Sequence, residues 1–212
     1  MTSDRVIVHQ YNPYYFLCWE AADAMARAEK EHAKIRSKYG RSKKWSEEDD
    51  HRAQQLVDET HTRVVAAPVF GIMAIEQLLH VYAVERLRKF DQVLEHIDRL
   101  DLETKWRLVL PLACGRELPR KSVAIAKMQK LASLRNHFTH PKPIVVSDPT
   151  DEKIENLGRK LEAHARMRYD VAREAPTTVS LLACELAELD RHHCVRKLIK
   201  GQGIPLRSTS DA

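Results

Sequence analysis

Apolar residues recur every three or four positions along most of the chain, which is the spacing of helices that bury one face. The pattern predicts helices over residues 14–38, 46–65, 69–90, 91–100, 101–110, 122–140, 151–173 and 178–199. Alternating runs typical of strands are scarce, and only a short stretch at residues 6–8 favours an extended chain. We therefore predict an all-α fold, with a single helical bundle over residues 1–200 and a disordered tail at 201–212.

The segment from Val69 to Phe90 is the most hydrophobic and is expected at the centre of the bundle. Pro68 precedes it directly and should kink this central helix or force it to restart, because proline lacks the N–H that the helical ladder needs. Glu76 lies inside the apolar segment between Ile75 and Leu79. It is a candidate partner for a buried arginine.

The predicted helix at 122–140 contains such an arginine. Its apolar face is formed by Ala124, Met128, Leu131, Leu134 and Phe138. At 100° per residue, Arg135 projects between Leu131 and Met128, in the middle of that face. A guanidinium does not lose its proton on burial. Arg135 must therefore be paired, line a cleft or lie at an interface.

His140 stands at the end of the same helix, because Pro141 stops the helix at or just before it. The sequence thus places a permanent cation on the inward face and a titratable imidazole close by. A histidine with its usual pKa of about 6.5 can accept a proton at neutral pH.

The segment Arg135-Asn136-His137-Phe138-Thr139-His140 resembles the motif of the HEPN superfamily, which is an arginine, four to six residues and a histidine. The resemblance implies a helical bundle that dimerises, so that two motifs meet in one cleft. It also implies a metal-independent endoribonuclease that leaves a 2′,3′-cyclic phosphate and a 5′-hydroxyl end. A toxin or phage-defence setting, with an antitoxin or other regulatory protein as partner, is part of the same implication.

In this reading His140 takes the proton from the ribose 2′-hydroxyl. Arg135 holds the scissile phosphate and neutralises the charge of the transition state, for which its planar fork is suited. Asn136 orients the phosphate or His140. Because RNA carries its own nucleophile, no metal or other cofactor is expected.

The alternative is a non-catalytic HEPN-like module that binds RNA or protein and dimerises through its helices. Arg135 would then form a buried pair with Glu76, and His140 would cap the helix, where the helix dipole favours a cation. Fold alone does not decide between these functions.

Basic residues surround the motif, and the chain carries a formal charge of +5 with a pI near 9.0. Such a charge favours anionic partners mildly. Four of these residues are candidates for contact with an RNA backbone: Lys127, Lys130, His137 and Lys142. The alternative for each is an ordinary solvated helix flank.

Other chemistries have little support in the sequence. Glu29-x-x-His32 and Glu48-x-x-His51 have the spacing of helical di-iron ligands, but both lie in charged segments and the chain has 11 His and 30 acids. The four cysteines are far apart, so reduced thiols are expected. No stretch of about 20 apolar residues and no signal sequence is evident, which predicts a cytoplasmic protein without membrane contact.

Overall fold

The computed structural model describes residues 11–39, 44–87, 96–97, 99–119, 121–140 and 151–206, without the side chains of 151–154 and 193. These ranges contain helices and no strand, so the all-α prediction is confirmed for them. The helices are α1 (Pro13–Tyr39), α2 (Glu47–Arg86), α4 (Leu102–Cys114), α5 (Val123–Thr139), α6 (Asp151–Arg173), α7 (Ala175–Leu189) and α8 (His193–Gly201).

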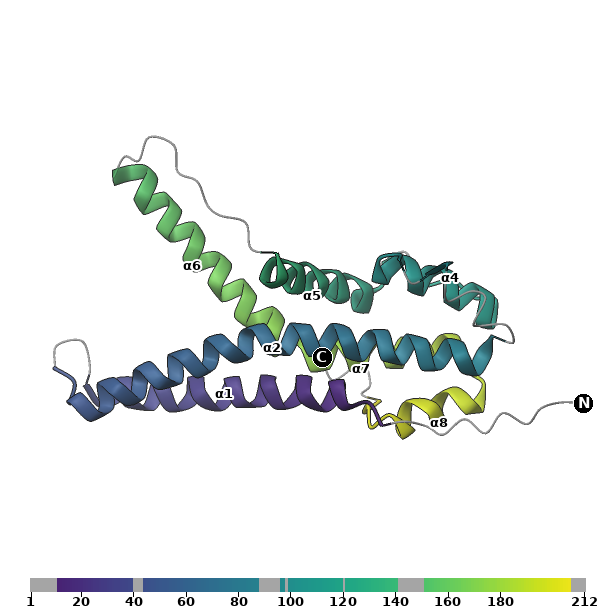
Figure 1. Ribbon diagram of the computed structural model, residues 1–212, viewed down its shortest axis with the longest axis horizontal. Coiled ribbons are helices and arrows are strands. Elements are labelled where there is room, and N and C mark those ends of the chain that lie inside the picture. The colour runs from purple at the N-terminus through teal and green to yellow at the C-terminus, as the bar shows by residue number, and fades with distance from the viewer. Residues whose placement is uncertain are drawn as a thin grey trace, which may run out of the picture.

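Helix α2 is the axis of the molecule and contacts every other helix in the described ranges. Figure 1 shows α1 running alongside it, α4 and α5 on its opposite side, and α8 near its C-terminal end. Helix α6 leaves this bundle at an angle, so that its first half stands away from the other helices. The hydrophobic segment predicted at the centre is the second half of α2, and Ile75 and Leu78 there are fully buried.

Four helices meet at Gly71 of α2. A Cβ atom at this position would lie 3.0 Å from Leu131 Cδ2 of α5, 3.3 Å from Cys18 Sγ of α1 and 3.4 Å from the Cβ of Ala175 of α7. The absence of a side chain therefore lets α5 pack directly on α2. Arg135 lies about one turn beyond Leu131 on the same face of α5.

Pro68 does not interrupt α2, which continues as one helix from Glu47 to Arg86. Figure 1 shows that its axis changes direction near the middle, and Pro68 lies at the middle of its sequence. A bend is the expected result where a proline removes one hydrogen bond from a helix that neighbouring helices hold in place. The kink was predicted, whereas a restart of the helix was not needed.

The end of the bundle near α8 differs from the prediction of one helix over 178–199. The chain leaves α7 at Asp190, whose backbone is extended at φ −106 and ψ 92, and starts α8 at His193. Asp190 is buried and accepts hydrogen bonds from Tyr82 Oη at 3.0 Å, Arg86 Nε at 2.7 Å and the His192 backbone N–H at 3.1 Å. These contacts fix the break.

Two further predictions are corrected. Helix α4 continues through Pro111 to Cys114 instead of ending before it. The predicted disordered tail begins too early, because Gln202 and Ile204 are buried and Gln202 Oε1 accepts from the Asn12 side chain at 3.1 Å. The predictions for residues 6–8, 91–95, 141–149 and 207–212 lie outside the described residues.

The long pair of α1 and α2 has a small core of its own at the end away from α8. Ala28, Ile35 and Leu56 form this second cluster, and Tyr39 and Trp45 pack against it. It is separate from the main core.

Candidate functional site at the end of helix α5

Helix α5 is held at both ends by its own side chains. At the start, Ser122 Oγ accepts from the Ile125 N–H at 3.0 Å and donates to the Glu185 carboxylate of α7. At the end, the Thr139 hydroxyl donates to the Arg135 carbonyl at 3.1 Å. The backbone N–H of His140 donates to the Asn136 carbonyl at 2.9 Å. The last turn, which carries the motif, is therefore well defined.

Arg135 lies where the sequence placed it, on the inward face of α5 beside the fully buried Leu131 and Met128. Its side chain is half-buried, and its Nε atom is buried without a hydrogen-bond partner. The predicted partner Glu76 is exposed and lines a different cavity, together with Tyr14 and Val109. Among the described residues, no ion pair neutralises Arg135, so the Arg135–Glu76 pair that was the alternative prediction is not formed.

Asn136 and His140 are exposed at the same end of α5. His140 is the C-cap residue, with φ −134 and ψ 65, so its side chain departs from the helical spacing. The structure thus gathers Arg135, Asn136 and His140 within the last turns of one helix, with Arg135 half-buried and the other two side chains open to solvent.

A groove of about 1160 Å³ runs between α5 and α6. Three of the four candidates for contact with an RNA backbone, Lys127, Lys130 and His137, line it on the α5 side, while Lys142 lies outside the described residues. Arg135, Asn136 and His140 do not line it. The groove therefore adjoins the motif on the neighbouring face of α5 and does not enclose it.

The wall opposite α5 was not predicted as part of a site. Helix α6 contributes basic groups to the groove, namely Arg159, His164, Arg166 and Arg168. The acids of the groove are Glu162, Asp170 and Glu174. Arg159 and Arg166 are seven residues apart and share a helix face, which the sequence could have revealed. That this face meets α5 depends on the tertiary arrangement.

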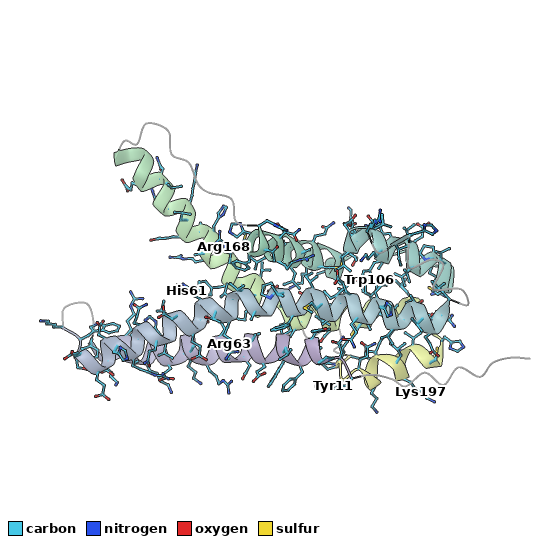
Figure 2. The ribbon with its side chains drawn as sticks, in the orientation of Figure 1. Tyr11, His61, Arg63, Trp106, Arg168 and Lys197 are labelled. Carbon is cyan, nitrogen blue, oxygen red and sulfur yellow. The ribbon has the colours of Figure 1, made fainter. Side chains whose placement is uncertain are left out.

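Side chains of three helices meet where α6 crosses α2 beside the end of α5. The Arg168 guanidinium lies 6.0 Å from the centre of the Phe138 ring, and the rings of His61 and Tyr169 are 6.3 Å apart. Figure 2 labels Arg168 and His61 at this crossing. Phe138 is three residues beyond Arg135, so a second cation lies close to the motif helix.

The charge of the groove affects His137. Burial lowers the pKa of its imidazole, and the positive charge of Arg168 and the nearby His164 lower it further. Burial is the larger cause, and the contribution of Arg168 and His164 shows that positive charge faces the groove beside His137. The groove is accordingly a place where an anion would be stabilised.

The part of the chain that the structure describes contains no arrangement of side chains suited to metal or thiol chemistry. No group of three or more His, Cys, Asp or Glu side chains there could hold a metal ion. All four cysteines are free, and burial raises the pKa of Cys18 to about 12, so its thiolate is disfavoured.

Among the described helices, α2 alone is long and apolar enough to cross a membrane by length and composition. Half of its most apolar stretch is buried against other helices. A central core helix meets the same criterion, so this feature indicates no membrane contact by itself.

No family model matches the chain, and neither the curated proteins nor the solved structures contain a significant match.

Proposed function

We propose that the protein is a metal-independent endoribonuclease of the HEPN kind, with its active site at the end of α5. The observation that carries this proposal is the half-buried Arg135, whose Nε atom has no partner and which no carboxylate neutralises among the described residues. A buried guanidinium nitrogen without a partner costs free energy. A phosphodiester supplies two oxygens in the geometry that the guanidinium fork prefers.

The chemistry needs one proton acceptor beside this cation. The His140 imidazole accepts the proton of the ribose 2′-hydroxyl, and the 2′ oxygen attacks the phosphorus. The bond to the 5′ oxygen breaks, and that oxygen takes a proton from solvent. The products are a 2′,3′-cyclic phosphate and a 5′-hydroxyl end. Arg135 stabilises the negative charge that builds up on the phosphoryl oxygens, and Asn136 orients the phosphate or the imidazole.

The test is cleavage of end-labelled RNA in the presence of EDTA. The parent chain should release products with cyclic phosphate ends, and His140→Ala should reduce the rate by about 10²-fold or more, as expected for loss of a general base. His51→Ala, which replaces an exposed histidine at the far end of α2, is the matched control and should cleave like the parent. Equal rates for the parent and His140→Ala would refute the proposal.

A second candidate is a binding module without catalysis. It is favoured by the separation between the α5–α6 groove, which gathers the cations, and Arg135, Asn136 and His140, which do not line it. Such a module would retain RNA with a strong salt dependence and release no products.

We also propose that the active form is a homodimer in which two motifs face each other. The molar mass in solution, measured by light scattering across a range of concentrations, tests this. A monomer that cleaves RNA at full rate would contradict the dimer and leave the chemistry in place.

A further inference from the structure

We propose that the α5–α6 groove holds one strand of RNA by its phosphates and so delivers the strand to the end of α5. The inference rests on the proposed ribonuclease function for its purpose, and it names the class of substrate: single-stranded RNA.

The charges of the groove favour a polyanion. Five side chains that are cationic at neutral pH line it, against three acids: Lys127, Lys130, Arg159, Arg166 and Arg168 against Glu162, Asp170 and Glu174. One cation and one acid of the groove neutralise each other, because Glu174 Oε2 lies 2.6 Å from Lys127 Nζ, so four cations face two acids in the rest of the groove. Among the described residues no ion pair joins Lys130 or Arg166 to an acid, and both side chains are exposed.

The cations stand on two facing walls. Lys130 belongs to α5 and Arg166 to α6, so a chain of phosphates between the helices can contact both. The α6 wall also carries apolar surface, since Met167 is 54% exposed. A positively charged groove that follows the backbone is one of the features by which proteins bind single strands without reading their sequence.

The size of the groove selects one strand over two. Its volume of about 1160 Å³ is only slightly above the roughly 300–1,000 Å³ of sites for small molecules. A few nucleotides of a flexible strand fit into that space. A rigid duplex, whose shape proteins recognise across wide groove faces, does not.

The experiment measures binding without cleavage. The probe is a fluorescent 2′-O-methyl RNA strand of about 12 nucleotides, within the site sizes known for single-strand binding. It lacks the 2′-hydroxyl, so its binding to the parent chain by anisotropy does not depend on catalysis. The double variant Lys130→Ala, Arg166→Ala should weaken binding on the order of tenfold and lower the slope of log affinity against log salt by about 1.4, for two lost phosphate contacts.

The matched control is Lys197→Ala, because Lys197 is an exposed lysine of α8 that Figure 2 places on the other side of the bundle. It should bind like the parent. Both variants should melt at the parent temperature, and a Lys130→Gln, Arg166→Gln variant repeats the test if the alanine variant melts lower. Unchanged affinity in the folded double variant would overturn the inference.

Two competitors identify the occupant. A hairpin duplex of the same strand should compete at least tenfold less well than the free strand, and equal competition would overturn the single-strand assignment. Polyglutamate should also compete weakly, and displacement as effective as that by RNA would make the groove a site for acidic protein instead.

The groove and the proposed function can fail separately. If the strand binds as described and the parent chain cleaves nothing, the ribonuclease is refuted and the groove stands. If the parent cleaves RNA and the groove variants keep its KM, the groove is refuted and the ribonuclease stands.

Discussion

Arg86 and Arg135 are two half-buried arginines in the same bundle, and their surroundings are opposite. Arg86, at the end of α2, donates to Asp190 at 2.7 Å and has a second nitrogen 3.5 Å from the Ala113 carbonyl. Burial alone would lower the pKa of Arg86, but the attraction of Asp190 outweighs it and leaves the pKa raised. Arg135 has a buried nitrogen without any partner.

The difference separates a structural arginine from one that is available to a ligand. Removing one member of a satisfied buried pair leaves an uncompensated charge and costs stability. Removing an arginine that is not satisfied costs little, because nothing is left unpaired. Stability and activity should therefore respond in opposite ways at these two positions.

The largest effect is expected for Arg135→Met on cleavage. The rate should fall about 10²–10³-fold, as for loss of one group that stabilises charge in a transition state. The free energy of unfolding should stay within about 0.5 kcal/mol of the parent, since methionine replaces the apolar stem without an unpaired donor. Initial rates and urea unfolding measure the two quantities. A loss of more than about 2 kcal/mol in stability would make Arg135 a structural residue like Arg86.

Asp190→Ala should have the largest effect on stability. It leaves Arg86 and the Tyr82 hydroxyl without their acceptor and removes the contact that fixes the break between α7 and α8. We expect the free energy of unfolding to fall by about 3 kcal/mol. This value is at the lower end for a buried pair, because the Arg86 side chain is still 23% exposed. Urea unfolding measures it.

The control for Asp190→Ala is Asp23→Ala, which breaks the exposed pair of Asp23 with Arg27 and should cost less than about 0.5 kcal/mol. Equal costs for the two aspartates would show that the buried cluster does not stabilise the fold.

Tyr82→Phe should lower the free energy of unfolding by a smaller amount, about 1 kcal/mol. It removes one neutral donor from Asp190, which keeps Arg86 and the His192 N–H. Tyr82 is fully buried, and this burial, together with Cys114 and Asp190, raises its pKa, so the hydroxyl stays protonated. Thermal melting followed by circular dichroism checks the loss. A variant more stable than the parent would show that the hydrogen bond from Tyr82 to Asp190 does not stabilise the fold.

The smallest effect concerns pH. The pKa of His137 is lower in the folded chain than in the unfolded one, so the unfolded chain binds more protons between the two values. The stability should therefore decrease as the pH falls through about 6.5, the usual pKa of histidine, and below it. His137→Gln should reduce this decrease, as measured by urea unfolding from pH 5 to 8. An unchanged pH profile would show that neither burial nor the groove cations lower the pKa of His137.

Helical periodicity was sufficient to place Arg135 on the inward face of α5, because that position depends only on neighbours within two turns. It was not sufficient for Asp190, which lies within the pattern that predicted one helix over residues 178–199. Its partners Tyr82 and Arg86 are 108 and 104 residues away. The α6 wall of the groove could not be predicted for the same reason: the angle at which α6 leaves the bundle is set by tertiary contacts.

The small cluster of Ala28, Ile35 and Leu56 has a consequence for how the molecule opens. It is the only buried apolar cluster that the described residues place outside the main core, and α1 and α2 alone supply its buried members. The half of the α1–α2 pair that contains this cluster should unfold locally while the main core stays folded. Its backbone amides should exchange with deuterium as one group, well before those around Gly71.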